Sequence, residues 1–259
     1  MGGKPVEALG ARMPALLAAS LLSCAAPVAN PVAPQPLQAP ATEPAVEPVD
    51  IAPEASVKPG INDPYFAPEG PERYTRILEA NTREIVQRRT DIVEAIGLRE
   101  GMIAADIGAG TGLLTIDMAE LVGPRGTVYA IDIVPAFLDR IRERASAAGL
   151  GNVIVVRGEE RTTGLKPASL DLAFMCDTYH HIEYPGAYMR SLFRTLRPGG
   201  TLVLVDMKRP DGASPATLRH VRADKATVIA EVEQAGFVFE SETDLLVENY
   251  YLRFKRPTR

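Results

Sequence analysis

Three glycines and one aspartate stand close together between residues 106 and 112, in the order Asp-Ile-Gly-Ala-Gly-Thr-Gly. The segment directly follows the apolar run 102–105, which we expect to be a strand, and it opens a helix predicted over 113–122. Glycine lets a ligand approach the backbone closely, because a Cβ would occupy that space. A glycine loop between a strand and a helix therefore predicts a ligand-binding loop.

The spacing of the glycines separates two classes of ligand. Dinucleotide-binding loops follow the pattern G-x-G-x-x-G, whereas the glycines here are Gly108, Gly110 and Gly112. The carboxylate of Asp106, two residues before the first glycine, would repel a pyrophosphate and attract a ligand with a positively charged amino group. A second carboxylate, Asp132, ends the predicted strand 128–131, where such a group binds ribose hydroxyls.

The loop resembles motif I of the S-adenosylmethionine-dependent methyltransferases, and the resemblance to the small-molecule branch of class I covers about residues 98–254. It implies that the cofactor is S-adenosylmethionine and that the three glycines pack against its methionyl part. It also implies that Asp106 contacts this part directly or through water. Glu159 lies where the family often has an aspartate that contacts the adenine amine, although Glu159 and Glu160 could equally form a solvated turn.

A polar segment, Cys-Asp-Thr-Tyr-His-His-Ile at 176–182, follows the predicted strand 170–175. The resemblance implies that the end of this strand faces the methyl group. Methyl transfer from a sulfonium needs mainly proximity and orientation, and a general base only if the acceptor arrives protonated. The candidate catalytic residues are Asp177, Tyr179, His180 and His181, with a histidine as the natural base.

Adjacent side chains do not readily point at one spot, so we expect one of the two histidines to pack against or cap the following helix. For the same reason we predict no metal site. His180, His181 and Asp177 could offer ligands, but neighbouring histidines converge poorly on a tetrahedral centre and no spaced Cys/His set is present. Tyr65 and Phe66 precede the first helices, and their position suggests part of a lid over the cofactor.

The elements that must position these residues alternate between strand and helix. Apolar runs predict strands at 102–105, 128–131, 153–156, 170–175 and 202–205, and helices at 113–122, 137–148 and 189–196. This rhythm predicts a doubly wound α/β fold with a parallel sheet that is covered on both faces.

The remaining elements lie before and after this alternation. One or two amphipathic helices are predicted between residues 72 and 96, and a single helix over 214–235. The strands predicted at 237–242 and 250–254 are joined by too short a connection to be parallel. A Rossmann-like, mostly parallel seven-stranded sheet that ends in an antiparallel hairpin is similar to the class I methyltransferases.

The first sixty residues differ in composition from the rest. Residues 1–24 contain a ten-residue apolar run and end in Leu-Leu-Ser-Cys, which resembles the lipobox of bacterial lipoproteins and implies a lipidated Cys24. The alternative is an extension without an export function, which leaves the protein in the cytoplasm. Nine of the 22 prolines lie between Pro27 and Pro59, so residues 25–60 are predicted to be a Pro/Ala-rich disordered linker. The predicted methyltransferase domain is then 61–259.

Composition narrows the function further. Two cysteines in 259 residues exclude a disulfide scaffold, and a net charge of -5 gives no reason to expect a nucleic-acid partner. Our first hypothesis is a methyltransferase that acts on a small-molecule acceptor. The second is a membrane-anchored or periplasmic lipoprotein that keeps the fold as an inactive binding or scaffold module. The third hypothesis is an NAD-dependent oxidoreductase. Export of the protein would conflict with the use of S-adenosylmethionine, because this cofactor is made in the cytoplasm.

Overall fold

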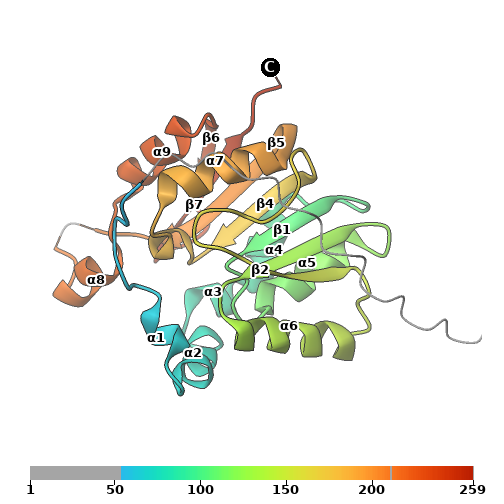
Figure 1. Ribbon diagram of the computed structural model, residues 1–259, viewed down its shortest axis with the longest axis horizontal. Coiled ribbons are helices and arrows are strands. Elements are labelled where there is room, and N and C mark those ends of the chain that lie inside the picture. Colours follow the sequence, from blue (N-terminus) through green and yellow to red (C-terminus); the bar gives the residue numbers. More distant parts are fainter. Residues whose placement is uncertain (1–53, 211, 259) are drawn as a thin grey trace, which may run out of the picture. The chain divides into compact units, whose positions relative to one another are not determined.

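The computed structural model of the chain describes residues 54–210 and 212–258 (Figure 1). The predicted leader, Cys24 and the predicted linker up to residue 53 lie outside the described residues. Within the described ranges, no helix is both long enough and apolar enough to cross a membrane.

A seven-stranded sheet in the order β3-β2-β1-β4-β5-β7-β6 forms the centre of the domain (Figure 1). The strands β1 to β5 pair in parallel, and β7 is antiparallel to both β5 and β6. These pairings confirm the predicted doubly wound sheet and its C-terminal hairpin. The strands are β1 (Ile103–Ile107), β2 (Thr127–Asp132), β3 (Val153–Arg157), β4 (Leu170–Cys176), β5 (Leu196–Met207), β6 (Val238–Thr243) and β7 (Asn249–Lys255).

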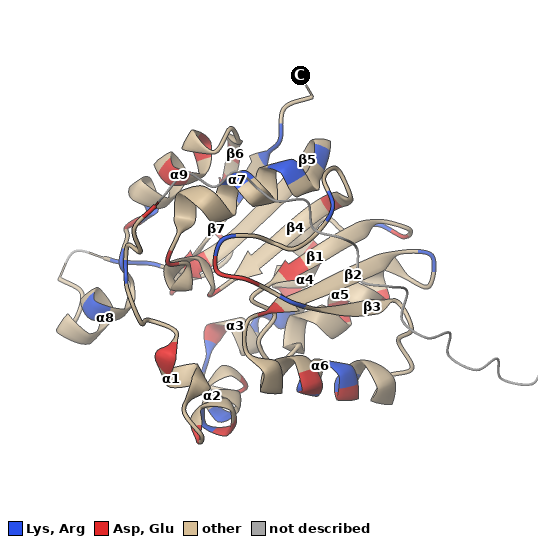
Figure 2. Cartoon of the chain, in the orientation of Figure 1, with Lys and Arg blue, Asp and Glu red and all other residues tan. Residues whose placement is uncertain are grey.

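Helices cover both faces of the sheet. One face packs against α4 (Arg89–Ile96) and α5 (Leu113–Val122), and the other against α7 (Pro185–Thr195) and α9 (Lys225–Gln234). The helix α6 (Pro135–Ala147) packs against β2 and β3 beside α5. Figure 2 shows charges of both signs along α6, whereas the strands are mostly uncharged. Both faces of the sheet are buried in apolar cores, so the polar residues at the ends of the strands are the groups available to bind a ligand.

Three short helices, α1 (Asp63–Phe66), α2 (Gly70–Leu78) and α3 (Glu84–Gln87), precede α4.

The structure differs from the predicted helices and strands in two places after α4. The single helix predicted over 214–235 is two helices, α8 (Pro215–His220) and α9. The chain breaks between them because Val221 and Ala223 are buried and the carboxylate of Asp224 caps α9 by accepting the Thr227 N–H at 2.8 Å.

The second difference is the turn Pro198-Gly199-Gly200, which interrupts β5 without ending it. Leu196 pairs with Leu170 and Thr201 pairs with Leu172, so the residues between them form a bulge in a strand that begins at Leu196.

The folded domain also begins before residue 61. Glu54 and Ser56, which fall in the predicted linker, contact the segment around α7. The carboxylate of Glu54 accepts the N–H groups of Gly186 at 2.9 Å and Ala187 at 2.7 Å, and Ser56 Oγ donates to Glu183 Oε2 at 2.5 Å. Glu54 therefore caps a helix whose own first residues provide no side-chain cap.

Replacing Glu54 with Ala removes this cap, and we expect it to lower the free energy of unfolding by about 1–2 kcal/mol. Urea unfolding of the full chain measures the change. Glu143→Ala is the matched control, because Glu143 lies exposed on α6 and its removal changes the net charge equally. Equal stabilities of the two variants would show that the contact of residue 54 with α7 does not contribute.

Candidate active site

An open cavity of about 1180 Å³ lies where the chain order of the sheet reverses, between β1 and β4. Its walls come from the loops after β1, β2, β3 and β4, together with residues 62–85 that precede the sheet. The crevice at this switch point is the general ligand-binding position of open α/β sheets. Both the glycine loop and the segment after β4 therefore face one space, as the sequence predicted.

The glycine loop is held against the end of β2 by backbone hydrogen bonds. The N–H groups of Gly108 and Ala109 both donate to the Ile131 carbonyl, at 2.8 and 3.0 Å. Gly108 has φ +69°, and a Cβ on it would lie only 2.3 Å from side-chain atoms of Thr178. Both the backbone conformation and the lack of space for a Cβ therefore exclude any residue other than glycine at position 108.

The other two glycines have different surroundings. Gly110 lines the cavity, whereas Gly112 begins α5 with φ +77° and is not among the lining residues. A Cβ on Gly112 would come within 2.9 Å of Ile141 Cγ1 on α6. The structure therefore places Gly108 and Gly110 at the ligand side of the loop, and gives Gly112 a role in helix packing.

Asp106 is a buried carboxylate at the wall of the cavity. Its Oδ2 accepts the Thr115 hydroxyl at 2.6 Å, and no donor from the described residues reaches Oδ1. Burial raises the pKa of Asp106 to about 7, the Asp132 carboxylate adds to the shift, and the Thr115 hydrogen bond opposes it. A cationic group in the cavity would stabilise the ionised form of Asp106.

Asp132 joins the glycine loop to the end of β2. Its Oδ2 accepts the Gly110 N–H at 2.8 Å and its Oδ1 accepts the Val134 N–H at 2.9 Å. Burial raises the pKa of Asp132 to about 6, although these backbone hydrogen bonds favour the charged form. Each carboxylate oxygen retains a further lone pair, so the group can still accept ribose hydroxyls.

These residues fit the predicted cofactor on two observations. The glycine loop is a cradle that a Cβ would fill, and Asp106 presents an oxygen without a protein donor beside it. Glu159 and Glu160 both line the cavity beyond the end of β3 and both are exposed. Glu159 and its neighbour Glu160 are thus both placed at the cavity wall, and the adenine contact of Glu159 stays a prediction.

Asp177 occupies the end of the cavity that follows β4. It has the unusual φ of +48°, and its carboxylate forms an ion pair with Arg83 and accepts the Asn249 side-chain N–H. Arg83 Nη1 also donates to the Leu78 carbonyl at 2.8 Å. Asp177 thus ties residues 78–83 to the sheet, which makes it a positioning residue as well as a cavity-lining one.

His181 lines the cavity and Tyr65 Oη lies 3.3 Å from its Nε2. Burial, with the neighbouring His180 and His220, lowers the pKa of His181 to about 2. Its imidazole is therefore neutral near pH 7 and a weak base. Tyr65 lies at the predicted lid position, whereas Phe66 is 52% exposed and lines no part of the cavity.

His180 and Tyr179 are directed elsewhere. His180 Nδ1 lies 2.5 Å from Asp206 Oδ1, and its backbone N–H donates to the other oxygen of that carboxylate at 3.0 Å. Burial alone would lower the pKa of His180, but the Asp206 carboxylate outweighs it and the pKa is raised. The Tyr179 hydroxyl donates to Glu231 at 2.7 Å. Neither His180 nor Tyr179 lines the cavity.

The sequence alone did not indicate Arg83 and Asn62, which line the cavity, or Asp206, which holds the His180 ring. Arg83 and Asn62 belong to the segment before the sheet, and Asn62 Nδ2 donates to the His181 carbonyl at 3.0 Å. Asp206 ends the apolar part of β5, so its place directly after the predicted strand 202–205 could have indicated it. The partners of the other two lie about 100 residues away, so no local pattern indicates them.

Comparison with known proteins adds independent information. Residues 105–204, from β1 into β5, match a family model described as "Methyltransferase domain". The chain is 36% identical over 122 residues to protein-L-isoaspartate O-methyltransferase of Ignicoccus hospitalis, over 46% of this chain and 54% of that protein. It is 30% identical over 135 residues to the ubiquinone/menaquinone biosynthesis C-methyltransferase UbiE of Pseudomonas putida, over 52% of each. The chain thus spans about half the length of these curated relatives.

A crystal structure described as a SAM-dependent methyltransferase from Aquifex aeolicus is similar in fold as well as in sequence. It has a TM-score of 0.64 and 25% identity, and the match covers 71% of this chain and 97% of that chain.

The raised pKa of Asp106 predicts how stability varies with pH. The folded protein holds the Asp106 proton up to about pH 7, whereas the unfolded chain loses it near pH 4. Ionisation of Asp106 therefore removes stability as the pH rises from about 4 to 7, by up to about 4 kcal/mol.

Asp106→Asn keeps an acceptor for Thr115 and cannot ionise. We expect this variant to be more stable than the wild type at pH 8, with the difference shrinking towards pH 4. Urea unfolding at several pH values measures it. A difference that is constant with pH would contradict the assigned pKa.

Proposed function

We propose that this chain, which carries a class I S-adenosylmethionine-dependent methyltransferase domain, transfers the methyl group of that cofactor to a small-molecule acceptor. The carrying observation is that the glycine loop, Asp106 and Asp132 line the same cavity as Asp177 and His181. One space can therefore hold a cationic adenosine ligand and a second molecule beside it.

The cofactor supplies an activated methyl group on a sulfonium, so the chain has to bind and orient it. Asp106 offers the negative charge that an ammonium group requires, and Asp132 offers acceptors for ribose hydroxyls. Because Gly108 has no side chain, Thr178 can pack directly against the backbone of the glycine loop. These contacts favour a cofactor with a positive charge over NAD, whose pyrophosphate would meet Asp106.

We place the acceptor beside the segment after β4, where Asp177 and His181 line the cavity, and we call this part the acceptor end. The cavity wall as a whole offers both polar and apolar groups. Tyr65, Arg83 and Asp177 contribute hydroxyl, guanidinium and carboxylate groups, while Phe137 and Tyr188 contribute aromatic surface. Residues 62–85 form part of the wall, which suits a compact acceptor that can enter the cavity. The relatives differ in this respect: one is named for isoaspartate in proteins and the other for quinone biosynthesis.

We assign His181 a positioning role at the acceptor end. A neutral imidazole with so low a pKa gains little by accepting a proton near pH 7. Its ring, held near the hydroxyl of Tyr65, can orient the acceptor by a hydrogen bond. Proximity and orientation are then the main contributions of the chain to methyl transfer.

Calorimetric titration of the full chain tests the cofactor half of the proposal. We expect binding of S-adenosylmethionine and none of NAD, and we expect Asp132→Asn to weaken binding at least about tenfold, because a charged acceptor is lost. Asp139→Asn on the exposed side of α6 is the matched control and should bind as the wild type does. Equal affinity of both variants would remove Asp132 from the cofactor site.

Transfer itself requires a second measurement. The full chain with methyl-labelled cofactor is offered hydroxyl, thiol, amine and quinone-type acceptors, and we expect label in one class. Binding of the cofactor without transfer to any class would favour a binding or scaffold module over an enzyme.

We also propose that the N-terminal segment attaches the protein to a membrane through a lipidated Cys24. The support is the apolar run that ends in Leu-Leu-Ser-Cys and the proline-rich stretch after it. Cell fractionation of the wild type and of Cys24→Ser tests this, and we expect only the variant to be released from membranes. A wild type found entirely in the soluble cytoplasm would overturn the anchor and would remove the conflict with a cytoplasmic cofactor.

A further inference from the structure

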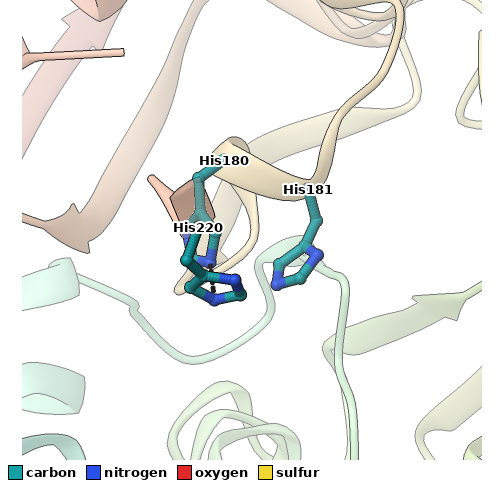
Figure 3. A group of neighbouring side chains, drawn as sticks. All are labelled: His180, His181 and His220. Atoms are coloured by element: carbon teal, nitrogen blue, oxygen red, sulfur yellow. Dashed lines mark hydrogen bonds between the residues drawn. The ribbon is translucent and has the colours of Figure 1, made fainter. Parts of the chain in front are cut away.

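All three histidines of the chain come together beside the acceptor end of the cavity (Figure 3). His180 and His181 belong to the short 3₁₀ helix η1 (Tyr179–His181), and His220 ends α8. One ring nitrogen from each lies within 4.8 Å of the other two. Figure 3 shows the rings of His180 and His220 in contact and a ring nitrogen of His181 directed towards them. We call these three residues the histidine cluster.

We propose that the histidine cluster binds one divalent first-row transition-metal ion, Zn²⁺ in the first place, with a fourth position open to the cavity. Three protein ligands and one exchangeable position are the ligand set of catalytic zinc, and three histidines are one of its known forms. No glutamate, aspartate or cysteine is needed to complete it.

The distances suit such an ion with a small movement. Two nitrogens bound at about 2.05 Å to a tetrahedral ion stand about 3.3 Å apart. His180 Nε2 and His220 Nε2 are already 3.1 Å apart. The widest separation in the cluster is at most 4.8 Å, so one ring must move inward by about 1.5 Å. His181 Nδ1 has no hydrogen-bond partner among the described residues, so this ring can move without breaking a hydrogen bond at that nitrogen.

Asp206 prepares His180 as a ligand. Its carboxylate lies 2.5 Å from His180 Nδ1, so the ring keeps a proton on that nitrogen and directs Nε2 towards His220. A carboxylate on the far nitrogen of a metal-binding histidine is the common outer-shell arrangement, because it fixes the ring and raises its basicity.

His181 is suited to be the ligand on the cavity side. It is the member of the cluster that lines the cavity, and its Nε2 lies 3.3 Å from Tyr65 Oη, which leaves Nδ1 for a metal ion. Its Nδ1 is buried and has no hydrogen-bond partner among the described residues. The ring is thus not held by a complete set of hydrogen bonds, as a purely structural histidine would be.

The charges around the cluster act in both directions. Lys58 Nζ donates to the His220 carbonyl at 3.0 Å, and its positive charge opposes a cation at the cluster. The Asp206 carboxylate, 2.5 Å from His180 Nδ1, has the opposite effect, whereas the charge of Asp177 is already paired with Arg83.

The consequence for catalysis rests on the proposed function. An acceptor hydroxyl bound at the fourth position would have a lowered pKa and lose its proton to solvent. Its oxygen then forms a bond to the methyl carbon while the carbon–sulfur bond of the sulfonium breaks, and the electron pair stays on sulfur. With a metal ion in this role no general base would be needed, and the acceptor atom would be an oxygen.

Metal titration of the full chain tests the site without any cofactor. After removal of metals with a chelator, we expect one equivalent of Co²⁺ to give the visible spectrum of a tetrahedral nitrogen site and one equivalent of Zn²⁺ to displace it. His220→Ala should weaken Zn²⁺ binding at least about tenfold, and Asp206→Asn by about 10- to 100-fold. Arg219→Ala, beside His220 on α8, is the matched control and should bind as the wild type does.

Thermal unfolding of each apo variant shows whether it folds, and the exposed His220 is the variant on which the conclusion depends. Substoichiometric Co²⁺ or equal affinities of wild type and His220→Ala would overturn the site. These readouts are independent of methyl transfer. If the chain binds the metal but not S-adenosylmethionine, the metal site is supported and the proposed function is contradicted. If it binds S-adenosylmethionine but not the metal, only the metal site is contradicted.

Discussion

Four aspartates at the carboxyl edge of the sheet set the chemistry of this domain. Asp106, Asp132 and Asp206 are buried on β1, β2 and β5, and Asp177 follows β4. Buried carboxylates are costly unless they are paired or hydrogen-bonded. Each of the four finds a different partner: the Thr115 hydroxyl, two backbone N–H groups, the Arg83 guanidinium and the His180 ring. The arrangement of the loops follows from these pairings.

The pairings also divide the edge into two halves. At β1 and β2 the partners are uncharged, so burial raises the pKa of Asp106 to about 7 and that of Asp132 to about 6. Without a cationic ligand, the ionised carboxylates of Asp106 and Asp132 therefore destabilise the folded state, as is common for a preformed binding site. At β4 and β5 the partners Arg83 and His180 are cationic or can become so. That half carries the histidine cluster.

Local patterns in the sequence were enough to predict the sheet, the glycine loop and Asp132. Strand and helix periodicity is local, and the glycine loop is read within seven residues. Contacts between distant residues were not predictable in this way. Glu54 reaches α7 across more than 130 residues, Arg83 reaches Asp177 across 94 and His180 reaches His220 across 40.

The place of His220 was equally out of reach of local patterns. The sequence puts it within a single helix predicted over 214–235, which the structure divides in two, and only the fold brings it beside His180 and His181. The break at residues 221–224 ends α8 at His220.

The histidine cluster combines residues from inside and outside the segment that matches the methyltransferase model. Residues 105–204 match the methyltransferase model, and both His220 and Asp206 lie beyond that segment. A site built from η1 inside the matched segment and from α8 outside it can vary without disturbing the cofactor half. Loops and short helices on a fixed sheet are where specificity for an acceptor is expected to lie. The same division explains why the cofactor could be inferred from a motif, whereas the acceptor has to be inferred from side chains that only the fold brings together.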